Sequence, residues 1–95
     1  MLFGLILKGR VQGVGCRYYC AQVARKMKIQ GNVTNLPDGS VRLIINCEDM
    51  ETMKNFTSNL KNNRFGFNFY GTITGISVQQ ITEESCKKIR SDYSF

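Results

Sequence analysis

The chain changes from a strand pattern to a helix pattern across a short glycine-rich segment. Leu2–Val11 alternates apolar and polar side chains with a period of two, which predicts a strand with one buried face. Gln12–Arg17 contains two glycines and predicts a turn. Tyr18–Lys28 has neither glycine nor proline, and it places apolar side chains at helical spacing. A strand, a tight turn and a helix are therefore expected in direct succession.

A hairpin is expected next. Asn32–Asn35 and Val41–Ile45 predict two short strands, which the strong turn sequence Leu36-Pro37-Asp38-Gly39 separates. A Pro-Asp-Gly turn sets the register of such a hairpin, so Asp38 is assigned to the turn rather than to catalysis.

A second helix and a later strand complete the pattern. Asp49 can cap the second helix. The apolar stripe of that helix is expected to contain Met50, Met53, Phe56 and Leu60. Tyr70–Gln80 predicts another strand, residues 81–91 predict a polar loop, and Tyr93–Phe95 is expected to add a short terminal strand. The order βαββαβ predicts an α+β fold of the ferredoxin-like type, with one antiparallel sheet and two helices on one face.

Length and composition predict one domain over residues 1–95, since the chain has 95 residues and 42% hydrophobic content. The apolar run Met1–Leu7 is too short for a signal sequence, and no other stretch approaches bilayer length. A cytoplasmic protein is therefore expected, with its 4 cysteines as reduced thiols because their spacing is irregular. A monomer is expected from the small size.

The chain contains no histidine, which excludes Ser-His-Asp and Cys-His nucleophile pairs and the usual zinc and haem ligand sets. The acidic residues come late and lack the spacing of calcium or magnesium sites. No metal and no cofactor are expected.

The net charge of +6 arises entirely before Asp38. Six basic residues and no acidic residue precede it: Lys8, Arg10, Arg17, Arg25, Lys26 and Lys28. Within this region the glycine-rich turn leads into a helix N-terminus, where free N–H groups and the helix dipole favour an anion. The planar fork of Arg17 matches two phosphate oxygens. The segment predicts a phosphate cradle, and a plain tight turn is the alternative.

Two other phosphate-binding loops fit less well. The segment lacks the Gly-Lys-Ser/Thr ending of a nucleoside triphosphate P-loop. The third glycine of a dinucleotide fingerprint would fall at Tyr18.

The stretch G-R-V-Q-G-V-G-C-R at residues 9–17, followed by G-N-V-T-N-L-P-D-G-S-V at residues 31–41, resembles the acylphosphatases. The first stretch is similar to the phosphate-binding loop of that family, and the second is similar to its asparagine strand and following hairpin. The resemblance is close over residues 5–46. It implies hydrolysis of a carboxyl-phosphate mixed anhydride without a metal or a phosphoenzyme.

The resemblance also implies roles for individual residues. The phosphate-binding residues would be Gln12, Gly13, Val14, Gly15, Cys16 and Arg17. Arg17 would hold the phosphoryl group, and the amide of Asn35 would orient the attacking water. The implied partner is a small acyl phosphate, with no nucleic acid and no membrane.

Three further features carry interpretations of their own. Asn32 lies an odd number of residues from Asn35, so it faces the other side of the sheet and is expected to be solvated. Cys16 stands where the family commonly has an aromatic residue, and a small buried thiol is expected there. The aromatic residues of segment Asn62–Tyr70 are expected to be alternately buried in a loop that enters a strand.

The alternative function is a non-catalytic RNA- or small-anion-binding module on the same fold, because Arg64 and several aromatics lie together.

Overall fold

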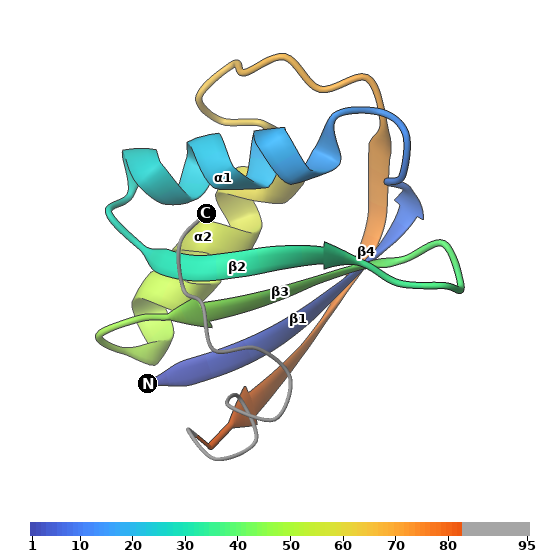
Figure 1. Cartoon of the computed structure of the whole chain (residues 1–95). Helices are drawn as coiled ribbons and strands as arrows, with labels where there is room; N and C mark the ends of the chain where they lie inside the picture. Colours follow the sequence, from blue (N-terminus) through green and yellow to red (C-terminus); the bar gives the residue numbers. More distant parts are fainter. Residues whose placement is uncertain (83–95) are drawn as a thin grey trace.

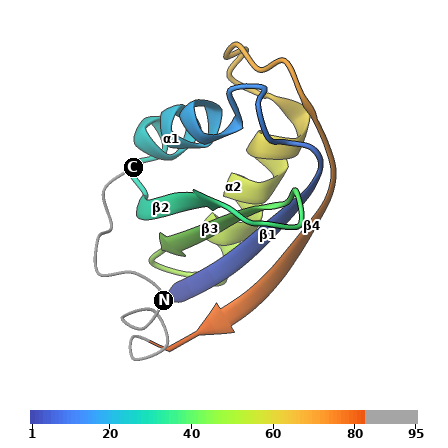
Figure 2. The same ribbon diagram turned by 45° about the vertical axis from the view of Figure 1, so that its right-hand side comes forward.

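The computed structural model describes residues 1–82, which form one antiparallel sheet with two helices on the same face (Figure 1, Figure 2). In chain order the elements are β1 (Leu2–Arg10), α1 (Cys16–Lys26), β2 (Gln30–Asn35), β3 (Val41–Asn46), α2 (Met50–Asn62) and β4 (Thr72–Ile81). The strands lie in the order β2-β3-β1-β4, and every neighbouring pair is antiparallel. The predicted ferredoxin-like βαββαβ order is confirmed. Ile81, which was predicted to begin a polar loop, is instead the last residue of β4. Residues 83–91 of that predicted loop and the predicted strand Tyr93–Phe95 lie outside the described residues.

The core lies between the sheet and the two helices. The predicted alternation of β1 is confirmed, because Leu5, Leu7 and Val11 are fully buried while Lys8 and Arg10 are exposed. Inward-facing residues of β3 and both helices complete the core, among them Val41, Leu43, Ile45, Tyr19, Val23, Phe56 and Leu60. Burial of this single apolar layer provides the main stabilisation of the fold.

Helix α1 begins and ends two residues earlier than its periodicity indicates. Gly15 takes a left-handed conformation with φ 80° and acts as the N-cap, so the helix starts directly at Cys16. At the other end Lys28 takes φ 58°, and the amide of Ile29 bonds to the carbonyl of Ala24 at 2.8 Å. A left-handed residue after a helix is usually glycine, so the sequence carries no clear signal for this end.

Helix α2 is capped as predicted, because the Asp49 carboxylate accepts a hydrogen bond from the amide of Thr52 at 2.8 Å. The predicted stripe is correct for Met53, Phe56 and Leu60, which are buried. It is wrong for Met50, which is 45% exposed, because the first residue of the helix lies beyond the part that packs on the sheet. Within residues 1–82, no helix combines the length and the apolar character needed to span a membrane.

Candidate active site

A cleft of about 300 Å³ opens where the loop after β1, the start of α1 and the end of β2 meet. Its lining residues are Val11, Gly13, Gly15, Cys16, Arg17, Tyr18 and Asn35. The cleft therefore brings Arg17 and Asn35 together, although they come from separate elements. Both side chains are exposed and can reach a ligand. None of the seven described lining residues is acidic, so the local charge favours an anion.

The backbone of the loop gives the cleft its second binding feature. Gly13 and Gly15 have φ values of 72° and 80°, which side chains other than glycine adopt only at a cost. Gly15 has no side chain with which to cap α1. The amides of the first helical turn have no acceptor within the helix and carry the positive end of its dipole. Together with the Arg17 guanidinium they form a site suited to a compact anion.

Gln12 has a role that sequence reasoning missed. Its side-chain Nε2 donates hydrogen bonds to the carbonyl oxygens of Leu36 at 2.6 Å and Ser40 at 2.8 Å. These bonds tie the loop after β1 to the β2–β3 hairpin. A glutamine next to a glycine-rich loop gives no sequence signal for such a contact, since its acceptors are backbone atoms of a distant segment.

Two of the expected phosphate-binding residues are not among the described residues that line the cleft, namely Gln12 and Val14. The side chain of Val14 is only 8% exposed and belongs to the core, and its carbonyl accepts a hydrogen bond from the amide of Tyr70 at 3.3 Å. Gly13, Gly15, Cys16 and Arg17 line the cleft, as does the expected water-positioning residue Asn35. The part of the assignment that concerns Gln12 and Val14 stays a prediction based on the family resemblance.

The two asparagines of β2 face opposite sides of the sheet, as their odd spacing predicts. Asn35 pairs with Val41 and Asn32 pairs with Ile44. The expectation that Asn32 is solvated is wrong, because only 2% of it is exposed. Its strand neighbour Ile44 is also buried, at 1% exposed.

Cys16 is the small buried residue expected at its position, and its Sγ lies 3.8 Å from that of Cys20. The hydrogen bond between Cys16 and Cys20 lowers the pKa of the Cys16 thiol, although burial opposes this effect. The same contact and burial raise the pKa of Cys20 well above its ordinary value. Both thiols and that of Cys47 are free, whereas Cys86 lies outside the described residues.

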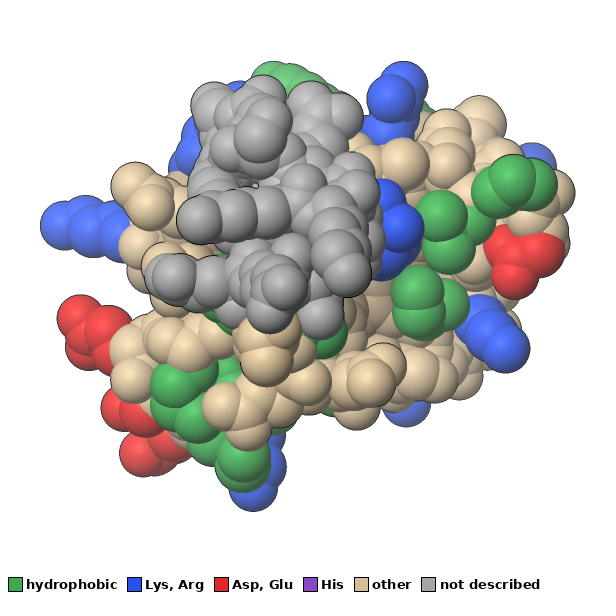
Figure 3. Space-filling model, turned by 60° about the horizontal axis from the view of Figure 1, so that its bottom comes forward, with side chains coloured by type: hydrophobic (Ala, Val, Ile, Leu, Met, Phe, Trp, Pro, Cys, Tyr) green, Lys and Arg blue, Asp and Glu red, His purple; other side chains and the backbone are tan. Residues whose placement is uncertain are grey.

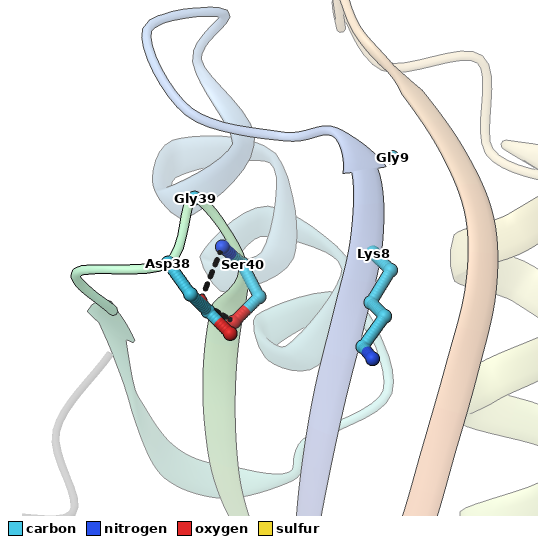
Figure 4. A pocket seen from close by; sticks show the side chains of 5 residues that line it. All are labelled: Lys8, Gly9, Asp38, Gly39 and Ser40. Carbon is cyan, nitrogen blue, oxygen red and sulfur yellow. Dashed lines mark hydrogen bonds between the residues drawn. The ribbon is translucent and has the colours of Figure 1, made fainter.

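A second cleft of about 290 Å³ lies beside the hairpin turn (Figure 4). Asp38 accepts hydrogen bonds there from the amide of Ser40 at 2.9 Å and from its hydroxyl at 2.5 Å. These bonds lower the pKa of Asp38, and the charge of Lys8 adds to the effect. The ionised carboxylate repels an anion, so this cleft is a poorer phosphate site than the one at Arg17. Asp38 serves the turn, as its sequence context predicts.

The aromatic segment after α2 packs against the core and against α1. Phe65, Phe67 and Phe69 are half-buried against the core, as expected for a loop with alternately buried aromatics. The ring of Phe69 stacks on Tyr19 with a centroid separation of 4.6 Å and an interplanar angle of 2°. These rings are used for packing, so they do not form the row of exposed stacking surfaces that RNA-binding sheets use.

Among the described residues, no three His, Cys, Asp or Glu side chains group closely enough to hold a metal ion.

Comparison with known proteins gives a consistent result. A family model described as Acylphosphatase matches residues 3–91. The chain is 39% identical over 77 residues to an acylphosphatase of Borrelia garinii subsp. bavariensis, covering 81% of this chain and 78% of that one. It is 34% identical over 89 residues to an acylphosphatase of Archaeoglobus fulgidus, covering 94% of each. Its fold matches the crystal structure of an acylphosphatase from Bacillus subtilis with a TM-score of 0.71 and 33% identity, over 85% of this chain and 86% of that one.

Proposed function

Because this chain belongs to the acylphosphatase family and is an acyl phosphate hydrolase, we propose that its reaction takes place in the cleft between Arg17 and Asn35. The observation that carries the proposal is that one cleft contains the N-terminal start of α1, an exposed guanidinium and an exposed amide. Each of these groups matches one requirement of phosphoryl transfer to water.

The phosphoryl group binds to the loop amides and to Arg17. Phosphoryl transfer spreads negative charge over the equatorial oxygens in the transition state, and fixed donors aimed at those oxygens lower the barrier. Arg17 supplies a planar pair of donors, and the glycine-rich loop allows successive N–H groups to approach the same anion. We assign the stabilisation of the transition state to these groups without a metal ion.

The amide of Asn35 positions the attacking water. An amide can accept one hydrogen bond from water through its carbonyl oxygen, but it cannot act as a base at neutral pH. Its contribution is to hold the water in line with the bond that breaks. The carboxylate is a good leaving group, so a strong general acid is unnecessary, and we assign the proton of the water to a phosphoryl oxygen of the substrate.

A small substrate also agrees with the distribution of charge. On the face shown in Figure 3, Lys and Arg side chains lie at separate places and do not form one continuous basic track. A polyanion such as RNA is normally bound by such a track. The described part of this face therefore offers no such track.

Hydrolysis of benzoyl phosphate in the presence of EDTA tests the proposal. Arg17→Ala is expected to lower kcat/KM by at least about 100-fold and to weaken inhibition by inorganic phosphate, because it removes the main charged donor. Asn35→Ala is expected to lower kcat by about 100-fold while phosphate inhibition changes little.

Arg64→Ala and Asn68→Ala serve as matched controls, since both residues are exposed and neither is among the described lining residues. Full activity of Arg17→Ala, or loss of wild-type activity in EDTA, would contradict the proposed mechanism.

A further inference from the structure

The cleft contains one large exposed side chain that the proposed chemistry does not use. Tyr18 lines the cleft beside Arg17 and is 65% exposed. The other apolar lining residues offer little surface, because Val11 is 1% exposed and Cys16 is 2% exposed. Among the described residues that line the cleft, Tyr18 is therefore the one large apolar side chain that is exposed.

Tyr18 lies in the first turn of α1, and packing of the neighbouring residue fixes its direction. Its neighbour Tyr19 points into the core, where it stacks on Phe69 and donates a hydrogen bond from its hydroxyl to the carbonyl of Leu60 at 2.6 Å. Successive residues of a helix are about 100° apart around the axis, so burial of Tyr19 turns Tyr18 outward. The first turn of α1 thus presents Tyr18 to solvent at the mouth of the cleft, and packing of the core does not account for the ring.

The chemistry of the substrate indicates what this ring contacts. The loop and Arg17 take the phosphoryl group, and the water at Asn35 must attack opposite the departing carboxylate. The acyl substituent therefore projects away from the anion site. The cleft volume of about 300 Å³ lies at the lower end of the range of small-molecule sites, roughly 300–1,000 Å³. A small aromatic acyl group can therefore lie inside the cleft, whose lining includes the ring of Tyr18.

We infer that the Tyr18 ring binds the acyl substituent and makes the enzyme prefer acyl phosphates with a flat aromatic or extended apolar acyl group. This inference rests on the proposed function, since it assumes that the phosphoryl group occupies the loop. An aromatic acyl group can stack on the ring, whereas the single methyl group of acetyl phosphate is too small to cover it. Tyr18 is thus a specificity-determining residue of the cleft.

The chain offers a matched control in Tyr70. Its side chain is 78% exposed and its amide bonds to the carbonyl of Val14 in the phosphate loop. Tyr70 is nevertheless not among the described residues that line the cleft. Removal of its ring changes exposed aromatic surface near the loop without changing the cleft.

The test compares kcat/KM for benzoyl phosphate and acetyl phosphate in the wild type, Tyr18→Ala, Tyr18→Phe and Tyr70→Ala. Tyr18→Ala is expected to lower the benzoyl-to-acetyl ratio by about five- to tenfold. Inhibition by inorganic phosphate should change less than about twofold, because the ring acts on the acyl group alone. Tyr18→Phe should retain the wild-type ratio, since it keeps the ring, and Tyr70→Ala should retain it as well.

An unchanged ratio in Tyr18→Ala would overturn the inference while leaving the proposed function intact. The same fall of the ratio in Tyr70→Ala, or in Tyr18→Phe, would also overturn it. Absence of hydrolysis of both substrates by the wild type would overturn the proposed function and this inference together.

Discussion

The side-chain amide of Gln12 donates a hydrogen bond to the carbonyl oxygen of Leu36 at 2.6 Å. Leu36 directly follows Asn35, so this bond connects the phosphate loop to the residue next to the proposed water-positioning amide. A second bond from the same Nε2 reaches Ser40 on the other side of the turn. The relative position of Arg17 and Asn35 therefore depends on a side chain that need not touch the substrate.

Gln12→Ala is expected to destabilise the protein by about 1–2 kcal/mol, because the carbonyl oxygens of Leu36 and Ser40 each lose one of two donors and the loop loses its tether to the hairpin. It should also lower kcat for benzoyl phosphate about tenfold, since a small misplacement of the water reduces in-line attack. Urea unfolding and steady-state kinetics measure the two effects. Gln80→Ala removes an exposed glutamine of β4 as the control. Unchanged kcat in Gln12→Ala would show that the tether does not position Asn35.

Gly71 lies where the chain before β4 crosses the phosphate loop. A Cβ at this position would lie 2.0 Å from the carbonyl oxygen of Arg10 and 2.5 Å from Cγ2 of Val14. Gly71→Ala must therefore displace the loop, and a loss of stability of about 1–3 kcal/mol is expected, together with weaker phosphate inhibition. Gly75→Ala, within β4, is the matched control, because no atom of the described residues comes within 4 Å of the added carbon. Equal stability of the two variants would contradict the close approach of Gly71 to the phosphate loop.

Tyr19 makes stability depend on pH in the alkaline range. Burial raises the pKa of its phenol to about 12, with smaller contributions from Cys20 and Cys16. The folded state holds the phenolic proton more tightly than the unfolded state, whose pKa is about 10. The contribution of Tyr19 is fully present below about pH 10 and is lost as the pH rises towards about 12.

Urea midpoints of the wild type and Tyr19→Phe at several pH values test this dependence. Tyr19→Phe should be less stable by about 1–2 kcal/mol at pH 8, because the carbonyl of Leu60 loses its donor. The difference between the two proteins should shrink above about pH 10, since only the wild type must ionise a buried phenol. A constant difference in stability between the two proteins across this pH range would contradict the raised pKa of the buried Tyr19 phenol.

The parts of the fold that depend on local patterns were predictable from the sequence. The alternation of Leu5 and Leu7 marks β1, and an aspartate at position 49 marks the start of α2, because both signals act over a few neighbouring residues. The nearness of Arg17 and Asn35 was expected only through the family resemblance, since no local pattern links two separate elements. The structure agrees with that expectation by placing both side chains in one cleft.

Other features arise only from tertiary contacts and carried no sequence signal. Gln12 bonds to backbone oxygens that any sequence would provide at those positions. Lys28 adopts a left-handed conformation in which glycine is more common, and the hydrogen bond of Ile29 to Ala24 accompanies it. The register of β2 with β3 places Asn32 opposite Ile44, and Asn32 is buried there although its polarity favours water.

The central claim is that water attacks the phosphorus atom of a phosphoryl group held at Arg17. Hydrolysis of benzoyl phosphate in water labelled with heavy oxygen, followed by mass analysis of both products, tests it most directly. Attack at phosphorus breaks the bond between phosphorus and the bridging oxygen, so the label is expected in inorganic phosphate and benzoate is expected to remain unlabelled. Label in benzoate would show attack at the carbonyl carbon and would contradict the assignment of the loop, Arg17 and Asn35.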